Sequence, residues 1–435
     1  MELNKLKSGT LLVLLAKGFL GGAGLLVTML LTRLLGTAEV GAYFMMAQIV
    51  NVGRLLSEAG MDVGLQKLIG VALADNDPAA VRRHTTSSFV LLMIGVAVVS
   101  TALFLGWQPL TDRLLDSPRL AAMAILAVPW LLGFSLEDLS SVFFRSLHEM
   151  KTAVLAIGLP RQLLLLPVLA WIWLTDIEVD LTMVIALVAT SWLLSGTVSA
   201  ALVLRRVLKI EKPAAYAMAP EVKAVLGLSL PMLLHTSALL VMGSADIWVL
   251  QIARGSEAVG VYGALVRISV SMAFLVGAVN MVLPPMLARL YKEGRKDEME
   301  DLLRRSASWG AYLAVPLTIV FVGFGGLVLS LAFTPEYAVG AIALAILASA
   351  HCFNTLSGSP GYVLQMTGGH LVLMRLTLGV ALLNLIGNIA LVGPLGMTGV
   401  ALSTGASLIV QNIAMVIIVK RRVGVKTWVK LPGLG

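Results

Sequence analysis

Charge and cysteine are both scarce in this chain of 435 residues. Asp, Glu, Lys and Arg together supply only 13% of the residues, against about 25% in a typical soluble protein. That shortage excludes an ordinary water-soluble enzyme, a disordered chain and a nucleic-acid-binding module, because each of these needs far more surface charge. The single cysteine, Cys352, excludes an internal disulfide framework and cannot by itself build a cysteine-rich metal site.

Apolar residues are correspondingly abundant in the chain. They make up 58% of the chain, and the mean hydropathy is +0.92. A bilayer needs about 20 mostly apolar residues per crossing helix, and the sequence contains twelve such stretches. They cover residues 9–32, 38–60, 86–107, 119–144, 153–174 and 181–204, and then residues 224–250, 258–287, 306–333, 338–365, 370–392 and 397–419. The pattern predicts an all-α integral membrane protein with twelve transmembrane helices.

The basic residues predict the orientation of these helices. With the N-terminus in the cytoplasm, 24 of the 32 Lys and Arg residues fall in cytoplasmic segments and 4 in outer segments. Cytoplasmic loops of membrane proteins carry such an excess. We therefore expect a multi-pass protein of the bacterial cytoplasmic (inner) membrane with both termini inside, and the net charge of +8 reports mainly this topology.

An internal repeat relates the two halves. The segment 36–43 (GTAEVGAY) matches the segment 255–262 (GSEAVGVY) at an offset of 219 residues. Each half has an even number of spans, so the repeats are parallel. The repeat predicts two six-helix bundles around a central cleft, with residues 1–207 and 224–420 as the bundles. Residues 208–223 are the expected cytoplasmic linker, and residues 421–435 a basic cytoplasmic tail.

Several motifs carry a family resemblance. They are a C-terminal series, an N-terminal hairpin and a short run after the fourth span: Leu364–Gly368, Leu383, Asn384, Asn388 and Gly393–Thr404; Leu31–Gly36 with Gly41 and Tyr43; and Phe143–Leu147 with Met150 and Lys151. In this order they resemble the polysaccharide-biosynthesis and O-antigen flippases of the multidrug/oligosaccharidyl-lipid/polysaccharide (MATE-like) exporter superfamily. Gly396 and Gly399 also have a structural explanation. Small residues after Pro394 allow a tight turn and let the two helices that it joins pack closely.

The resemblance implies a substrate and a direction. Members of this family move polyprenyl-pyrophosphate-linked sugars from the cytoplasmic to the outer leaflet, as in lipopolysaccharide synthesis. Lipid-pyrophosphate flippases of the superfamily carry basic residues on helices one, two and eight, which Lys17, Arg54 and Arg267 match by helix and approximate depth. The same resemblance makes polysaccharide polymerase and glycosyltransferase components candidate partners, beside membrane lipids.

Four basic residues lie inside the predicted spans: Lys17, Arg54, Arg161 and Arg267. A cation at mid-bilayer costs about 2.5–3.5 kcal/mol on the insertion scale, so such residues face a wet cavity or a partner. We expect them to bind the pyrophosphate. The alternatives are structural ion pairs, as between Arg267 and Asp246, or snorkelling to the interface for Lys17 and Arg54.

Acidic residues inside the predicted spans allow two interpretations. Glu58, Glu137, Asp138 and Asp246 are candidates for ion coupling or for charge pairing with the bases. They also sustain a rival function, a cation-coupled multidrug exporter of the same superfamily, whose cleft would be acidic. A non-transporting scaffold of a polysaccharide assembly, which needs no charged cleft, is the third hypothesis.

Catalytic motifs are missing from the sequence. It shows no phosphate-binding Gly-Lys-Ser loop, no metal-ligand spacing and no large outer loop for a polymerase site. We expect a transporter rather than an enzyme, with no cofactor, no metal and no nucleic-acid partner.

Overall fold

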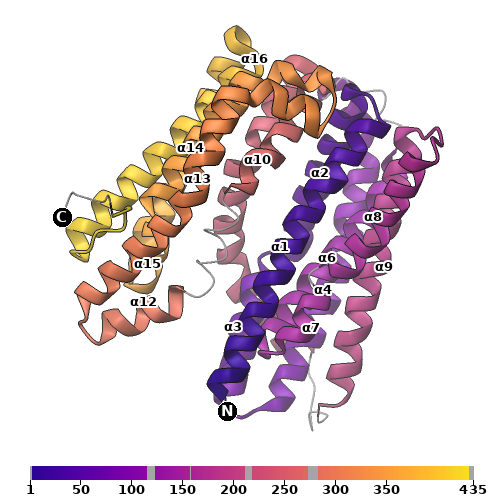
Figure 1. Ribbon diagram of the computed structural model, residues 1–435. Coiled ribbons are helices and arrows are strands. Elements are labelled where there is room, and N and C mark those ends of the chain that lie inside the picture. Colours follow the sequence, from indigo (N-terminus) through magenta and orange to yellow (C-terminus); the bar gives the residue numbers. More distant parts are fainter. Residues whose placement is uncertain (1, 115–122, 157, 211–217, 273–282, 431–435) are drawn as a thin grey trace. The chain divides into compact units, whose positions relative to one another are not determined.

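The structure is a computed structural model of the chain, and it describes residues 2–114, 123–156, 158–210, 218–272 and 283–430. The side chains of residues 2–17, and of a few positions elsewhere, lie outside that description. Every regular element in the described ranges is helical, and no strand occurs there (Figure 1). The predicted all-α class is confirmed.

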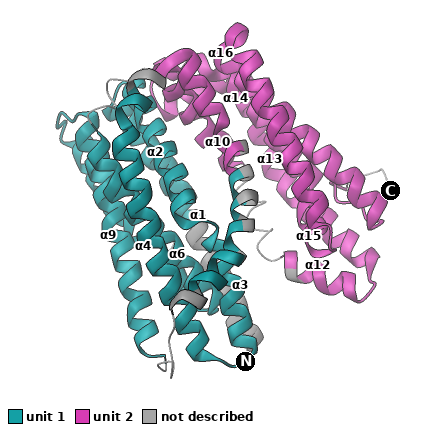
Figure 2. Ribbon diagram, turned by 180° about the vertical axis from the view of Figure 1, so that it is seen from behind, with its two compact units in different colours: residues 1–237 teal, residues 238–435 magenta. Residues whose placement is uncertain are grey.

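The chain divides into two compact units, Met1–Ser237 and Ala238–Gly435, here called the N-terminal and C-terminal units (Figure 2). The division falls inside one long helical run, α10 (Met218–Ser271). The predicted bundle limits at residues 207 and 224 stay a prediction.

The N-terminal unit is built around one central helix, α6 (Ala124–Ser146), which contacts α2, α3, α4 and α9. Gly133 on α6 and Gly196 on α9 face each other so closely that a Cβ on either would meet the other helix's backbone. Small residues permit this approach between membrane helices. The other helices are α1 (Glu2–Leu34), α2 (Thr37–Glu58), α3 (Met61–Ala74), α4 (Pro78–Gln108), α7 (Met150–Leu155), α8 (Leu159–Leu174) and α9 (Leu181–Leu208), with a π-helical turn at Pro109–Leu114.

Local sequence explains where these helices begin. Asp77 caps α4, because its Oδ1 accepts a hydrogen bond of 2.8 Å from the backbone N–H of Ala80. This N–H, and then the Arg83 guanidinium, lower the pKa of the exposed Asp77 carboxyl. At the start of α2, the Glu39 carboxylate accepts from the backbone N–H of Gly36 at 3.0 Å, as in a capping box.

The C-terminal unit contains the rest of α10 and the helices α12 (Leu283–Lys292), α13 (Lys296–Ala332), α14 (Ala341–Ser357), α15 (Pro360–Met366) and α16 (His370–Arg422), with a 3₁₀ turn at Pro335–Gly340. At one end of the unit, α12, α13, α15 and α16 share a buried apolar cluster that includes Leu287, Leu303, Leu364 and Val419.

Two of the long helical runs are helical hairpins. In α16 the backbone leaves helical geometry at Gly396 (φ 56°), and Thr377 and Gln411 lie 3.3 Å apart across that point. In a straight helix these residues would be about 50 Å apart. In α10 the break is at Gly255 (φ 77°), and Tyr262 bonds back to Asp246 at 3.0 Å. The predicted turn after Pro394 and the close approach at Gly399, where a Cβ would meet the Leu391 carbonyl, are both confirmed.

The two copies of the repeat occupy similar places in their units. Val40 and Val259 are each fully buried, and so are Gly41 and Gly260. Each copy begins at or just beside a break between two helices, at Gly36 and at Gly255. The sequence match between the halves therefore reflects the same packing of a second helix against a first.

Apolar side chains cover the outside of both units. Leu105, Ile125 and Leu331 are 75%, 71% and 69% exposed, which suits lipid and not water. Within the described residues, seven helical segments are long and apolar enough to cross a membrane: Pro78–Thr111, Ala124–Ser146, Lys151–Leu174, Leu181–Leu208, Lys296–Ala332, Pro335–Ser357 and His370–Arg422. The protein is a multi-pass membrane protein, and the number of twelve crossings stays a prediction.

The segment after α16 packs against the C-terminal unit. The Thr427 hydroxyl donates to the Ser357 carbonyl at 2.8 Å, and the Val429 N–H donates to Leu356 at 2.9 Å. The Lys426 N–H donates to the Glu300 carboxylate at 2.9 Å. The first residues of the predicted basic tail thus join the ends of α13 and α14.

Candidate functional site

The predicted cations fall in both units. Lys17 lies on α1, but its side chain is outside the described residues. Arg54 on α2 and Arg161 on α8 belong to the N-terminal unit, and Arg267 on α10 belongs to the C-terminal unit.

Arg54 is the centre of a buried ion-pair group. Its Nη1 lies 2.6 Å from Glu58 Oε2 and also pairs with Asp138 on α6. Its Nε donates to Asn51 Oδ1 at 3.4 Å, and its guanidinium lies 4.9 Å from the ring centre of Phe134. The Glu58 side chain is only 3% exposed, so this pair is held away from water.

Arg161 forms a second group beside the first. Its Nε lies 3.8 Å from Glu137 Oε2, and its guanidinium lies 3.8 Å from the ring centre of Trp192. Pro160 stands in the first turn of α8, where proline is tolerated and does not kink the helix. Instead the chain breaks before it, between α7 and α8, at Gly158.

The two groups are joined through α6, because Glu137 and Asp138 are consecutive residues. Together they place three carboxylates around two guanidinium groups. Three further buried oxygens nearby in the sequence, Gln48 Oε1, Glu58 Oε1 and Gln162 Oε1, have no hydrogen-bond partner among the described residues. Buried acceptors of this kind are normally satisfied by water or a ligand. Sequence reasoning found the charges but missed both glutamines, because a lone Gln in an apolar helix has no distinguishing pattern.

Gly158 holds the second group in place. It adopts φ 93°, and a Cβ there would lie 2.6 Å from Glu137 Oε1 and 2.9 Å from Arg161 Nη2. We expect Gly158→Ala to lower the melting temperature, because it adds steric conflict to the about 1–2 kcal/mol of left-handed strain. Gly294→Ala is the matched control, since Gly294 (φ 72°) has open space around it. Equal losses in thermal melts of the two purified variants would show that the crowding at Gly158 is unimportant.

Arg267 is different from Arg54 and Arg161. Its side chain is exposed, and it has no ion pair with any residue that the structure describes. It lies 12 residues beyond the turn at Gly255, or about 18 Å along the helix, and the predicted span 258–287 would place it near the middle of a bilayer about 30 Å thick. A guanidinium at that depth needs water or an anion beside it.

Asp246 does not supply that anion. It is 6% exposed, and its Oδ2 accepts a hydrogen bond of 3.0 Å from the Tyr262 hydroxyl. The pairing of Arg267 with Asp246 that we considered is therefore not made. Among the described residues Asp246 faces no base, so a proton or a small cation must neutralise it when it is buried.

A polar network continues from Asp246 into α16. Tyr262 hydrogen-bonds Thr404, the Asn384 amide donates to Thr404 Oγ1 at 3.1 Å, and the Asn388 amide donates to Asn384 Oδ1 at 3.2 Å. Thr404, Asn384 and Asn388 belong to the C-terminal motif series. The sequence did not link them to Asp246, because the link runs through Tyr262 of the repeat.

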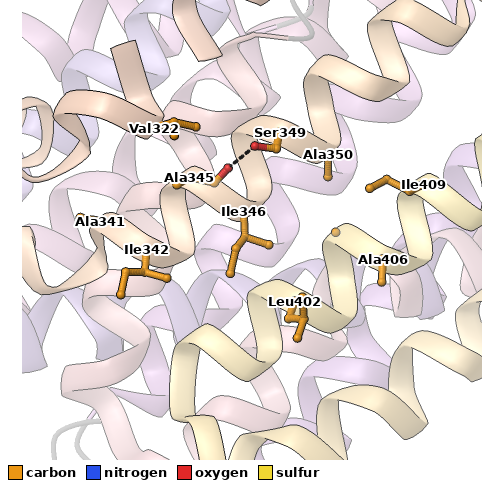
Figure 3. A pocket seen from close by; sticks show the side chains of 11 residues that line it. Val322, Ala341, Ile342, Ala345, Ile346, Ser349, Ala350, Leu402, Ala406 and Ile409 are labelled. Carbon is orange, nitrogen blue, oxygen red and sulfur yellow. Dashed lines mark hydrogen bonds between the residues drawn. The ribbon is translucent and has the colours of Figure 1, made fainter. Parts of the chain in front are cut away.

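The C-terminal unit has an apolar groove of about 510 Å³ between α13, α14 and α16 (Figure 3). Its lining includes Ile342, Ile346, Leu402 and Ile409, and the hydroxyl of Ser349 donates within its own helix to Ala345 at 2.7 Å. The lining offers no charged group, so this groove suits hydrocarbon and not a phosphate.

Solved membrane transporters share this fold. An inward-facing multidrug resistance MATE family transporter of the MOP superfamily matches 92% of this chain and 94% of its own with a TM-score of 0.74 at 16% identity. The lipid II flippase MurJ in an inward closed conformation matches 94% of this chain and 87% of its own with a TM-score of 0.76 at 12% identity. The chain thus has the MATE-like fold of helical membrane transporters, as the motifs predicted.

The family follows from the sequence match. Residues 6–291 match the family model described as "Polysaccharide biosynthesis protein", and the chain belongs to this family. The capsular polysaccharide biosynthesis protein CapF of Staphylococcus aureus is 26% identical over 167 residues, which is 38% of this chain and 42% of that protein. The matched segment thus spans less than half of that relative. The resemblance found in the motifs is confirmed.

Proposed function

We propose that the protein is a flippase that carries polyprenyl-pyrophosphate-linked oligosaccharide from the cytoplasmic to the outer leaflet by alternating access. The exported sugar would build a cell-surface polysaccharide, with polymerase and glycosyltransferase components as partners. The site of action is the bacterial cytoplasmic membrane, with both termini inside. The observation that carries the proposal is Arg267, a guanidinium without a protein partner in the described chain at mid-membrane depth.

The chemistry of Arg267 fits a pyrophosphate. A guanidinium donates several hydrogen bonds in a fixed fork that matches phosphate oxygens. A cationic drug would be repelled by the same group. The membrane anchor of the substrate needs only apolar surface, which both units offer in abundance.

Arg54 and Arg161 differ from Arg267 in how they could bind a pyrophosphate. Both are already neutralised by carboxylates, so a pyrophosphate would have to compete with Glu58, Asp138 or Glu137 for them. We propose Arg267 as the direct contact of the pyrophosphate, and Lys17, Arg54 and Arg161 as further contacts. Asp246 is the candidate for ion coupling, because it is the buried carboxylate that faces no base in the described chain.

The two ion-pair groups hold three carboxylates against two guanidinium groups, and this acidic surplus keeps the multidrug alternative open. One experiment separates the functions. The purified protein is placed in liposomes with a fluorescent polyprenyl-pyrophosphate disaccharide on one leaflet, and a parallel set carries a cationic dye. Translocation of the lipid without efflux of the dye supports the flippase. Efflux of the dye alone supports a multidrug exporter, and neither activity supports a scaffold.

A further inference from the structure

A second groove lies in the N-terminal unit, away from all the charges discussed so far. Its volume is about 440 Å³, and it is lined by the last turn of α1, the end of α8 and the connection to α9. Figure 1 shows the end of α1 and the α8–α9 connection at the end of this unit opposite the N-terminus. The predicted topology places that end outside the cell.

The groove combines one aromatic side chain with three charged ones. Its lining includes Arg33, Trp173, Asp176 and Glu178. The Arg33 guanidinium lies 5.6 Å from the ring centre of Trp173, and Trp173 is 42% exposed. Arg33 belongs to the N-terminal motif and lies in the last turn of α1.

These side chains discriminate between parts of the substrate. Two carboxylates against one guanidinium disfavour a pyrophosphate. The same carboxylates are strong acceptors for hydroxyl groups, and Arg33 offers donors beside them. An indole ring supplies an apolar surface with a polar edge, which suits the C–H faces of a pyranose ring. The volume lies within the about 300–1,000 Å³ of small-molecule sites.

Resting on the proposed function, we propose that this groove binds the oligosaccharide of the lipid-linked substrate at the outer face of the membrane. Trp173 stacks on a sugar ring distal to the pyrophosphate. Asp176 and Glu178 accept hydrogen bonds from its hydroxyl groups, and Arg33 donates one. The groove thereby holds the glycan on the outer side after the headgroup has crossed.

The simpler explanation is a tryptophan of the interfacial aromatic belt, which would need no charged groove around it. The chain offers a matched control for this explanation. Trp171 lies two residues earlier on α8, is 59% exposed, and is not part of the groove. A belt role predicts equal effects of Trp171→Ala and Trp173→Ala, whereas a glycan site predicts an effect of Trp173→Ala alone.

Binding is measured directly on the detergent-solubilised protein. The probe is the lipid-free repeat-unit oligosaccharide released by mild acid from the organism's own polyprenyl-linked pool, titrated by isothermal calorimetry, which needs no tryptophan as reporter. We expect saturable binding by the wild type and by Trp171→Ala, and none by Trp173→Ala. Glu178→Gln and Asp176→Asn should each weaken binding by about 10-fold, the usual effect of losing one charged hydrogen-bond acceptor. Asn also tolerates the left-handed backbone of Asp176 (φ 49°).

Translocation gives the second readout. In liposomes, Trp173→Ala should slow the oligosaccharide-linked lipid by about 10-fold and leave the monosaccharide-linked lipid at the wild-type rate. Equal binding by the wild type and Trp173→Ala, or equal slowing by Trp171→Ala, would overturn the site. If Trp173→Ala fails to fold, Glu178→Gln decides, and its unchanged affinity would overturn the site. If the wild-type protein moves neither lipid, the proposed function is wrong. The binding titration still tests the groove in that case, because it does not depend on translocation.

Discussion

Arg267→Ala should slow translocation of the polyprenyl-pyrophosphate disaccharide by about 10- to 100-fold, which corresponds to one charged hydrogen bond of about 1.5–3 kcal/mol. The protein should remain inserted and keep its melting temperature. The reason is that Arg267 is exposed and makes no ion pair in the described chain, so its loss leaves no buried charge behind.

Two variants control this result. Arg267→Lys keeps the charge but loses the fork, and we expect an intermediate rate. Arg305→Ala removes another exposed arginine, which pairs with Asp301 at 2.8 Å in the first part of α13, and it should leave the rate unchanged. A normal rate in Arg267→Ala would remove the main support for a pyrophosphate site, and a loss of melting temperature would assign Arg267 a structural role.

Arg54→Ala should destabilise the N-terminal unit by about 3–5 kcal/mol, because removing one partner of a buried ion pair leaves the others uncompensated. Here the remaining groups are Glu58 and Asp138. The expected measurement is a lower unfolding midpoint in detergent. Arg305→Ala is the control, since the exposed pair of Arg305 with Asp301 should contribute less than about 1 kcal/mol.

A triple variant separates stability from transport. Arg54→Ala combined with Glu58→Gln and Asp138→Asn removes the uncompensated charge, and it should recover most of the lost stability. If Arg54 also contacts the pyrophosphate, as we propose, translocation should remain slow in this stable variant. Recovery of translocation together with stability would show that Arg54 serves only to balance the two carboxylates.

The class, the family and the turns of this fold could be predicted from the sequence because they depend on local chemistry. Runs of apolar residues require a membrane, and Gly255 and Gly396 mark the turns of the hairpins in α10 and α16. The motifs then identified the family. The break at Gly158 was missed because residues 153–174 form one apolar stretch, although proline in a first turn, here Pro160, begins a helix.

The sequence identified the charged residues of the candidate site but not which of them form ion pairs with one another. Charged residues in apolar helices are easily found, and Lys17, Arg54, Arg161 and Arg267 all stood out in the sequence, Arg267 most clearly. Which of them lies beside a carboxylate depends on contacts between α2, α6 and α8, far apart in the sequence. In the structure, carboxylates neutralise Arg54 and Arg161, whereas Arg267 has no ion-pair partner in the described chain. Asp246 accepts a hydrogen bond from Tyr262 and does not pair with Arg267.

The central claim is that the cargo is an anionic lipid moved outward, and a voltage applied to the liposome assay tests it most directly. Moving two negative charges outward across a membrane that is negative on the cytoplasmic side gains about 4.6 kcal/mol per 100 mV. We predict that a potential of this sign accelerates outward translocation of the polyprenyl-pyrophosphate disaccharide by the wild type, and that the opposite sign slows it. Translocation that ignores the potential, or transport of the cationic dye in place of the lipid, would contradict the account.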